Sequence, residues 1–399
     1  MSEKPLPLAG LTVLDFGQIY QGPYATFLMA KAGADVIKIE SPAGEPLRRR
    51  APPGKTGTFA MALLNANKRA ITLNLKTLRG RALLVELVKC ADVLLENFSP
   101  GTMDDLGVGY AVLSAANPRL IHATGTGYGI SGPDRDNLAM DFTVQAASGI
   151  MSVTGWPDGP PTKAGPTLVD FMGGIHLYAG VMTALYHRMF TGRGQLVEVA
   201  MQEAVYPTMA TSMEYHVTTG KTPPRAGNRQ ASLVSAPYNA FPTRDGWVAI
   251  HVVTDQHWQN LLRAMGREEL AGDPRFSTHP VRGQHPDEVE AIVAAWTQEQ
   301  SKADVAAIAA RYKIPCAPVR TVDEVMRDRH MHERGFLQEV SHPDFGEVTL
   351  PNSPLRLHGT AHVAPAPSPA LGQDNEAVYG GMLGLKMEDI AELRLEGVI

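Results

Sequence analysis

The chain has 399 residues, 44% of them hydrophobic and 19% charged, and a formal net charge of −5. A globular protein of this size can bury one large core or two ordinary ones, so we expect one to three domains. The basic residues are scattered and form no long positive stripe, which argues against nucleic acid as a partner.

No run of about 18 or more uncharged apolar residues occurs, and residues 1–10 lack the apolar stretch of a signal peptide. We therefore expect a cytoplasmic protein without a membrane partner. The cysteines, Cys90 and Cys316, lie far apart in the sequence, so neither a disulfide framework nor a metal site is indicated. Reduced, buried thiols are the expectation.

Residues 11–40 are predicted to form a strand, a helix and a second strand. LTVLDF and DVIKIE are the strands, and the segment between them contains Gly22-Pro23 followed by small and apolar residues. A βαβ unit of about 30 residues is the building block of a parallel sheet. RAITLNL, ADVLLENF and RLIHATGTGYG predict further strands, so the first half of the chain indicates a doubly wound α/β sheet.

A helix, a Gly-rich turn and a strand follow in residues 173–205, and then the composition changes. Residues 217–239 are rich in Thr, Gly, Pro and Asn and predict an ordered loop or linker. The strand GWVAIHVV and helices around DQHWQNLLRAMG, PDEVEAIVAAWTQEQ and KADVAAIAARY then indicate a smaller α/β region. From residue 344 the chain is strand-like and interrupted by prolines, and it ends in an amphipathic helix, KMEDIAELRLEG.

The glycine cluster GTGYGISG, residues 125–132, is a weak match to a dinucleotide-binding fingerprint. That fingerprint belongs on the first strand-to-helix turn, whereas this cluster runs into a polar loop. A nicotinamide site is therefore disfavoured against a tight loop that backbone or ligand approaches closely. No G-x-S-x-G elbow supports a serine hydrolase. His176 and His187, about three turns apart on one predicted helix, are too distant to share a metal ion.

Lys68, Arg69 and Lys76 flank a predicted strand in NKRAITLNLK, where an anionic ligand with phosphates could lie along the sheet edge. The alternative, which this segment alone favours, is a solvated strand edge protected by cations.

Asp170, in GPTLVDFMGGIHLYAG, is the strongest candidate for chemistry. An Asp before a helix is first of all an N-cap, and that role explains most such residues. Gly173 and Gly174, however, weaken the first helical turn by up to about 1 kcal/mol each relative to Ala, so another backbone or a ligand must approach there. In a dry pocket between Phe171 and Met172, the carboxylate could act as a nucleophile toward an activated acyl group.

Taken together and in order, several segments resemble the class III coenzyme A transferases, the family of formyl-CoA transferase and the carnitine CoA-transferases, which is related to α-methylacyl-CoA racemase. They span nearly the whole chain: VLDFGQIYQGPYAT, GADVIKIE, NANKRAITLNLKT, ADVLLENFSPG, NPRLIHATGTGYG, VDFMGGIHLYAGVMTAL and TGRGQLVEVAMQEAV. The resemblance implies a large Rossmann-like domain of residues 1–220 and 340–399 and a small α/β domain of residues 221–339 with linkers. It also implies that two ring-shaped subunits form an interlocked homodimer.

The activity that the resemblance implies is an acyl-CoA:carboxylate CoA-transferase in which Asp170 attacks the donor thioester. A mixed anhydride and then an aspartyl-CoA thioester follow, and an acceptor carboxylic acid removes CoA by the reverse steps. Because the thioester energy is kept in the acyl-enzyme, neither a metal nor a tightly bound cofactor is needed, provided that water is excluded. Succinyl-CoA is the donor suggested by analogy.

The residues that contact CoA, carried over in the same way, belong to three segments: Tyr20 and Gln21; Leu73, Asn74, Leu75 and Lys76; and Asn97, Phe98 and Ser99. Two arginines of formyl-CoA transferase are replaced here by Ser41 and Asp105, so that Lys38, Arg48 or Arg69 would have to hold the phosphates. The glycine-rich lid of that enzyme is absent from the sequence, which argues against formate and oxalate as acyl partners.

A racemase shares the fold and the Asp, but its second base is a histidine, at the position where this chain has Met140. A thioether cannot transfer a proton, so the racemase hypothesis is disfavoured. A CoA-binding protein without catalytic activity is the remaining alternative. The acceptor acid is not defined by any motif. Residues 48–50 are three arginines, which could bind a dicarboxylate or form a solvated loop. The segment around residues 230–239 contains no pattern that indicates a particular acid.

Overall fold

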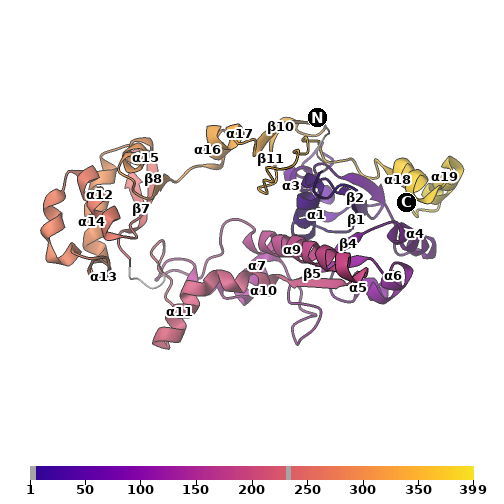
Figure 1. The fold of residues 1–399 in the computed structure, drawn as a ribbon, viewed down its shortest axis with the longest axis horizontal. Coiled ribbons are helices and arrows are strands. Elements are labelled where there is room, and N and C mark those ends of the chain that lie inside the picture. Colours follow the sequence, from indigo (N-terminus) through magenta and orange to yellow (C-terminus); the bar gives the residue numbers. More distant parts are fainter. Residues whose placement is uncertain (1–5, 231–234) are drawn as a thin grey trace. The chain divides into compact units, whose positions relative to one another are not determined.

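The computed structural model describes residues 6–230 and 235–399, which form two compact units (Figure 1). The large unit contains the residues up to 148, residues 165–207 and residues 328–399, and the small unit contains residues 149–164 and 208–327. The boundaries expected from the sequence, 220 and 340, differ from these breaks, and the domain assignment stays a prediction. The expected linker includes residues 231–234, and the segment examined for a signal peptide includes residues 1–5; both lie outside the described residues.

The large unit is built on a six-stranded sheet with the order β3-β2-β1-β4-β5-β6, in which every neighbouring pair is parallel. Val13 of β1 lies beside Val36 on one side and Val93 on the other, and all three are buried. Strands buried on both faces are typical of parallel sheets covered by helices, so the expected α/β architecture is confirmed. The strands are β1 (Thr12–Asp15), β2 (Asp35–Glu40), β3 (Arg69–Thr72), β4 (Val93–Glu96), β5 (Ile121–Thr126) and β6 (Leu196–Ala200).

Helices α1 (Gln21–Lys31) and α9 (Leu168–Thr191) cover one face of this sheet (Figure 1). Their buried side chains, among them Met29 and Leu177, share one hydrophobic cluster with alternate residues of β1, β4 and β5. Helices α7 (Asp141–Ala147) and α10 (Met201–Val205) contact α9. The large unit also contains α2 (Pro46–Arg49), α3 (Phe59–Leu64), α5 (Thr102–Asp105), α17 (Arg329–Glu333) and an antiparallel hairpin of β10 (Leu337–His342) and β11 (Gly346–Pro351).

The other face is covered by α4 (Leu78–Lys89), α6 (Tyr110–Ala116) and the C-terminal helices α18 (Asn375–Leu383) and α19 (Met387–Leu395). The C-terminal segment also closes the edge of the sheet at β3. Asp374 Oδ2 accepts a hydrogen bond from the Ala70 N–H at 2.7 Å, and Asn375 Oδ1 accepts one from the Thr72 N–H at 2.9 Å. The two side chains are 304 and 303 positions from their partners in the sequence. They bind backbone N–H groups of a strand edge that would otherwise be open.

The small unit is built on an antiparallel sheet with the order β7-β8-β9. Trp258, Leu262, Val289 and Val305 are fully buried in its core, between this sheet and the helices. Its strands are β7 (Tyr238–Thr243), β8 (Gly246–His251) and β9 (Cys316–Pro318). Its helices are α8 (Ile150–Val153), α11 (Ala210–Thr219), α12 (Asp255–Met265), α13 (His279–Arg282), α14 (Pro286–Gln298), α15 (Lys302–Arg311) and α16 (Val322–Met326).

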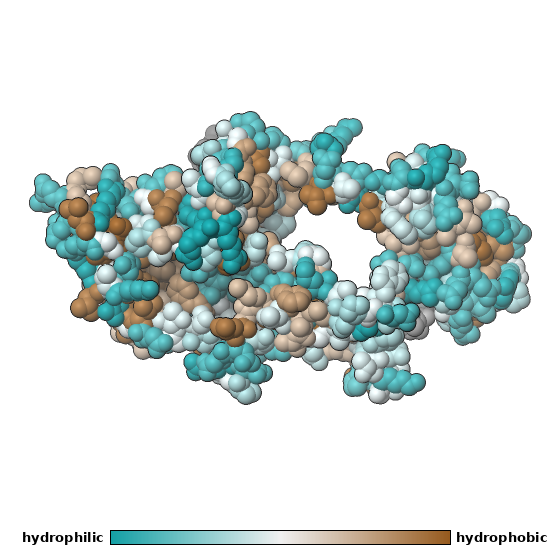
Figure 2. All heavy atoms as spheres, turned by 180° about the vertical axis from the view of Figure 1, so that it is seen from behind, coloured by the Kyte–Doolittle hydropathy of each residue, from teal (hydrophilic) through white to brown (hydrophobic). Residues whose placement is uncertain are grey.

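Helix α9 is long and apolar enough to cross a membrane by length and composition, and 33% of its most apolar window is buried in the protein. The search of the sequence for uncharged runs did not detect it because the helix contains Asp170 and Arg188. Arg188 pairs with Asp92 at 2.8 Å, and the buried side of α9 packs on the sheet. Its other side exposes Tyr186, Met189 and Phe190. On the face of the molecule shown in Figure 2, apolar residues form separate patches among hydrophilic ones.

Buried charges hold the start of the large unit together. Asp15, at the end of β1, is fully buried and forms an ion pair with Lys68 at 2.8 Å. Burial alone would raise the pKa of Asp15, but Lys68 and Lys38 outweigh it, so the pKa is lowered and the carboxylate stays ionised. Lys68 also donates to Thr26 of α1 at 2.8 Å. The pair therefore joins the strand, the helix and the chain before β3.

Removing one partner of this pair leaves an uncompensated buried charge. We expect Lys68→Met to lower the free energy of unfolding by about 3–5 kcal/mol, measured by urea denaturation at pH 7. The matched control is Arg69→Met, because Arg69 is the next residue and pairs with Asp35 at the surface. The control should change stability by less than about 1 kcal/mol. Equal losses in the two variants would contradict the role of the buried pair.

Candidate active site

The residues expected to act together meet at the carboxyl ends of the central strands. There, the strand order reverses direction between β1 and β4, which is where open parallel sheets bind ligands. A pocket of about 240 Å³ lies at this position. We call it the Asp170 pocket, and it is lined by Gln18, Ile19, Gln21, Pro46, Arg50, Asn97, Phe98, Ser99, Pro100, Gly125, Thr126, Gly127, Arg135, Asn137, Ala139, Met140, Asp170 and Met201.

Asp170 lies in the first turn of α9, but it does not cap that helix. The N-cap residue is Thr167, whose side chain makes no capping hydrogen bond. Asp141 of α7 takes this role: its Oδ2 accepts hydrogen bonds from the N–H groups of Val169 at 2.7 Å and Asp170 at 3.2 Å. Gln145 Nε2 donates to the other oxygen of Asp141 at 2.6 Å. The capping role considered for Asp170 from the sequence is therefore wrong, because a neighbouring helix supplies the cap.

The Asp170 carboxylate is left desolvated and without a partner. Among the residues that the structure describes, none donates a hydrogen bond to it. Burial, and then the negative charge of Asp141, raise the pKa of Asp170 to about 7. A carboxyl group that titrates near neutral pH, in a pocket, is a candidate for chemistry rather than for stability.

The two glycines after Asp170 allow α1 and α9 to pack closely. A Cβ atom on Gly173 would lie 2.8 Å from Gln21 Nε2, and one on Gly174 would lie 2.7 Å from the Gln21 carbonyl oxygen. The sequence left open whether another backbone or a ligand approaches these glycines. The structure places Gln21 of α1 there, with its side chain at Gly173 and its backbone at Gly174. Gln21 is 2% exposed, lines the Asp170 pocket, and its Nε2 has no hydrogen-bond partner within the described residues. A free amide donor thus lies in the same pocket as the free carboxylate.

The loop between β1 and α1 is held in one conformation. Gln18 and Asn97 exchange two hydrogen bonds, from Gln18 N–H to Asn97 Oδ1 at 2.7 Å and from Asn97 Nδ2 to the Gln18 carbonyl at 3.0 Å. Ile19, with φ of +64°, adopts a left-handed conformation that a β-branched residue rarely takes. Its N–H donates to Glu45 at 3.0 Å. These bonds compensate for the backbone strain of the loop that forms one wall of the pocket.

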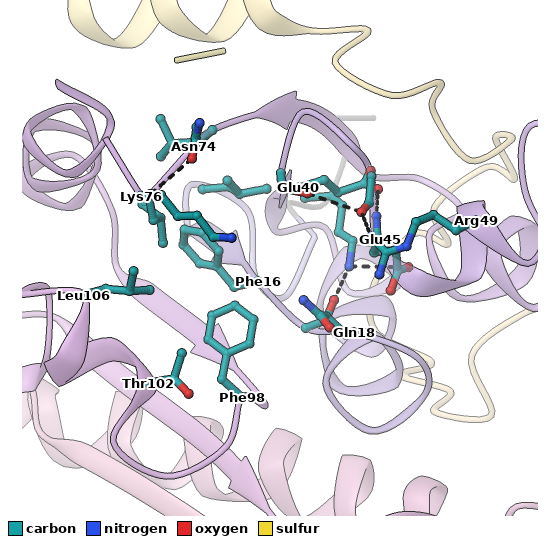
Figure 3. Close-up of a pocket in the computed structure, with 17 residues that line it drawn as sticks. Phe16, Gln18, Glu40, Glu45, Arg49, Asn74, Lys76, Phe98, Thr102 and Leu106 are labelled. Carbon is teal, nitrogen blue, oxygen red and sulfur yellow. Dashed lines mark hydrogen bonds and ion pairs between the residues drawn. The ribbon is translucent and has the colours of Figure 1, made fainter. Parts of the chain in front are cut away.

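A second pocket of about 240 Å³ adjoins the first and shares Gln18 and Phe98 with it. Figure 3 shows Asn74 and Lys76 on one side of this pocket, the rings of Phe16 and Phe98 at its centre, and Arg49 on the other side. We call it the Lys76 pocket. It contains all four residues of the segment 73–76, of which Lys76 is exposed and Leu73 is buried.

Eight of the nine residues expected to contact CoA line these two pockets. The exception is Tyr20, which precedes α1 and whose ring centre lies 6.1 Å from that of Phe171, next to Asp170. The sequence did not single out Gln18, Arg135 or Asp141. Gln18 lies within a segment that was recognised and Asp141 follows Met140, whereas Arg135 lies in a polar loop that carries no pattern.

The cations proposed to replace the missing arginines are already paired. Lys38 is fully buried, lies 3.7 Å from Glu45 and donates to the Gly17 carbonyl, and Arg48 binds Glu40 at 2.8 Å. Lys68 and Arg69 are paired with Asp15 and Asp35. Each of these side chains is therefore already bound to a carboxylate of the protein. Their role in holding phosphates stays a prediction, and of the four, Lys38 lines the Lys76 pocket. Lys76 and Arg49 also line the Lys76 pocket, and they form no ion pair with described residues. Ser41 lines this pocket and Asp105 does not.

No group of three or more metal-binding side chains is found among the described residues. His176 Nδ1 lies 2.8 Å from the Met172 carbonyl, within its own helix. Cys316 is partly buried, and this burial raises its thiol pKa to about 11, which makes it a poor nucleophile. Cys90 is exposed, contrary to expectation, because it follows the last residue of α4.

The raised pKa of Asp170 predicts a titration near neutral pH. The infrared difference spectrum between wild type and Asp170→Asn, recorded as a function of pH, should show the Asp170 carboxylate band appearing with a midpoint at a pH of about 7. Asp141→Asn should move this midpoint to lower pH, because it removes a negative charge but keeps an oxygen for the Val169 N–H. Asp158→Asn, an exposed change in the small unit, is the control. A wild-type midpoint near the ordinary value of about 4 would contradict the description of the pocket.

The same shift has a consequence for stability. The pKa of Asp170 is about 7 in the folded state and about 4 in the unfolded state. The folded protein therefore loses stability as the pH rises through this range. Asp170→Asn, which cannot ionise, should therefore be more stable than wild type at pH 8 by on the order of 2–4 kcal/mol. The difference should disappear near pH 4, in urea denaturation at both pH values. A less stable variant at pH 8 would show that the carboxylate has a stabilising partner.

Comparisons with known proteins show the family to which the chain is similar. The model of CoA-transferase family III matches residues 8–375. Succinyl-CoA–D-citramalate CoA-transferase of Chloroflexus aurantiacus is 36% identical over 398 residues, covering 99% of this chain and 98% of that protein. Formyl-CoA:oxalate CoA-transferase of Streptomyces coelicolor is 37% identical over 411 residues, covering 98% and 99%. The crystal structure of a CAIB/BAIF family protein from Brucella suis has a TM-score of 0.85 and 32% identity, covering 95% of this chain and 100% of that one.

A family model that spans most of the chain, together with relatives that match it nearly from end to end, confirms the resemblance noted in the sequence. The protein is an enzyme, a CoA-transferase, and the chain belongs to CoA-transferase family III.

Proposed function

We propose that this enzyme moves CoA from a donor acyl-CoA to an acceptor carboxylic acid through covalent intermediates on Asp170. The observation that carries the proposal is the Asp170 carboxylate itself, which is desolvated, unpaired, and exposed to a pocket at the switch point of the sheet. Withdrawal from water removes the hydration shell that makes an ordinary carboxylate a weak nucleophile. With a pKa of about 7, roughly half of the groups are ionised at neutral pH.

The reaction balances without any further reagent. An Asp170 oxygen bonds to the donor carbonyl carbon and the C–S bond breaks, giving a mixed anhydride and CoA thiolate. The thiolate attacks the Asp170 carbonyl, which releases the donor acid and leaves an aspartyl-CoA thioester. The acceptor carboxylate attacks this thioester and frees the thiolate again, forming a second anhydride. Attack of the thiolate on the acceptor carbonyl then yields the new acyl-CoA and restores Asp170.

Each attack on a carbonyl forms a tetrahedral centre with a negative oxygen. Gln21 Nε2, buried and unpartnered in the same pocket, is the donor that we assign to this oxygen. The pocket also has to keep water from the anhydride, because hydrolysis would release the acid without transfer. Apolar groups from Phe98, Met140 and Met201 contribute to its lining.

The two adjoining pockets provide a path for CoA. We place the nucleotide in the Lys76 pocket, with Leu73, Asn74 and Leu75 as its wall and Lys76 and Arg49 as free cations for phosphates. The pantetheine arm would pass Phe98, which both pockets share, and bring the thioester to Asp170 beside Asn97 and Ser99. Tyr20 then supports the site through Phe171.

Substrates are inferred from the relatives. Proteins that match over nearly the full chain are described as CoA-transferases for succinyl-CoA with D-citramalate or L-malate, for succinate with glutarate, and for formyl-CoA with oxalate. We infer a small carboxylic acid as the acceptor and a succinyl-type donor. No tightly bound cofactor is part of the proposal. Met140 lines the Asp170 pocket, and since it cannot exchange a proton, a racemase remains disfavoured.

For the assembly, we propose the architecture that the resemblance implies: a Rossmann-like large domain, ring-shaped subunits and an interlocked homodimer in the cytoplasm. The exposed apolar side chains of α9, Tyr186, Met189 and Phe190, support a protein partner on this helix, because single exposed aromatics are common but a cluster of them on one helix is not.

The decisive test concerns Asp170. Asp170→Asn and Asp170→Ala should lower CoA transfer by at least about 10⁴-fold while the protein stays folded, since no other group can carry the acyl chain. Asp158→Asn, an exposed change in the small unit, is the matched control. Mass spectrometry after incubation with a panel of acyl-CoAs and trapping with hydroxylamine should place the modification on Asp170.

Three outcomes would contradict the proposal. Undiminished transfer by Asp170→Asn, or an adduct on another residue, would remove the nucleophile. Exchange of the α-proton in heavy water without a second acid would indicate a racemase. CoA binding with no adduct from any donor would indicate a binding protein.

A further inference from the structure

A small cleft of the large unit is lined by cations and by no carboxylate. It lies among the end of α1, the turn between α17 and β10, and the segment 352–363, and its volume is about 130 Å³. Lys31, Arg334, Arg356 and His362 line it, and none of its ten lining residues is Asp or Glu. We call it the basic cleft. It shares no residue with the Asp170 pocket or the Lys76 pocket.

The cations of the basic cleft are not neutralised within the protein. In the described part of the chain, Lys31, Arg334 and Arg356 form no ion pair. Lys31 Nζ donates only to the neutral amide of Asn67, at 2.7 Å. Arg188, by comparison, is buried and pairs with Asp92 at 2.8 Å. The chain has 41 acidic and 36 basic residues, so a shortage of carboxylates does not explain this local excess of positive charge.

Two further groups of the cleft indicate a missing partner. Burial lowers the pKa of Lys31 to about 8, which means that its ammonium group has lost water without gaining an anion. Gln338 Oε1 is buried and has no hydrogen-bond partner within the described residues. Rotation of this amide by half a turn would present its Nε2 as a donor at the same place. Three cations and one amide donor thus converge on one space.

We propose that the basic cleft binds a small, multiply charged anion of the phosphate or diphosphate class. Two arginines and a lysine from three distant segments match the several oxygens of such a group, because guanidinium groups bind phosphate oxygens in pairs. The cleft is smaller than the 300–1,000 Å³ that is usual for drug-sized ligands, so it holds the anionic group rather than a whole nucleotide. This site is independent of the proposed transfer reaction.

Helix α1 connects the basic cleft with the Asp170 pocket. Gln21, which lines the pocket, is the first residue of this helix, and Lys31, which lines the cleft, is the last. At 1.5 Å per residue the two ends lie about 15 Å apart. Lys31 lies at the C-terminal end of α1, where the helix dipole favours a cation and repels an anion. The attraction for an anion therefore comes from the Lys31 side chain and not from the helix dipole.

The test is calorimetric titration of the full chain with inorganic pyrophosphate and with inorganic phosphate, at constant ionic strength and with saturating CoA. Wild type should bind pyrophosphate saturably with one site per chain, and more tightly than phosphate. Arg334→Gln and Arg356→Gln should each weaken this binding at least tenfold. Arg311→Gln, which removes an exposed arginine of the small unit, is the matched control and should bind like wild type.

Three results would overturn the proposal. Heats that sodium chloride reproduces would show ionic strength alone. Binding that is lost in Lys76→Gln but kept in Arg334→Gln would assign the anion to the Lys76 pocket. A change of molecular mass in sedimentation caused by Arg334→Gln and Arg356→Gln would show that an acidic segment of a second copy fills the cleft. Transfer activity is measured separately, so a failure here leaves the role of Asp170 untouched.

Discussion

The hydrogen bonds from the first turn of α9 to Asp141 are the interaction on which the rest of the site depends. Two backbone N–H groups are bound by a carboxylate of another helix, so the carboxylate of Asp170 is not needed for capping. Burial raises the pKa of Asp170, and the same arrangement adds to this by placing a second negative charge nearby. The residue that caps the helix therefore also contributes to the raised pKa of Asp170. A cation in contact with Asp170 would have lowered its pKa, and Arg50 and Arg135 line the pocket without pairing with it.

The second requirement is a fixed wall for the Asp170 pocket. The loop after β1 contains a strained Ile19 and is fixed from both sides, by Asn97 of the next strand's loop and by Glu45. Lys38 and Asp15 bind the backbone of Gly17 beneath it. Buried charges are costly unless they are paired, and here the paired charges hold a loop that contacts both pockets. The same network of paired charges thus stabilises the fold and fixes the loop beside the pockets. Because its basic residues are bound to carboxylates of the protein, few basic residues near the sheet are available for phosphates.

Much of the fold could be predicted from the sequence, because it depends on local patterns. The βαβ unit, the buried strands and the C-terminal amphipathic helix all follow from hydrophobic periodicity and turn residues. Asp170 was recognised from its two glycines, although the packing of α1 rather than a ligand explains them. Pairing could not be predicted: the sequence shows that Lys38, Arg48 and Lys68 are basic, but it does not show which carboxylates neutralise them. The role of Asp141 was missed for the same reason, since it acts across two helices.

The closing of the β3 edge by Asp374 and Asn375 has a consequence for synthesis of the protein. At about 5–20 residues per second, a ribosome needs on the order of 15–60 s between making this strand and making the side chains that cover it. During that interval the small unit is translated while the sheet still has an open strand. A nascent chain of this enzyme therefore emerges with its first unit unfinished, and a chaperone that shields strand edges would act on it until the last thirty or so residues arrive.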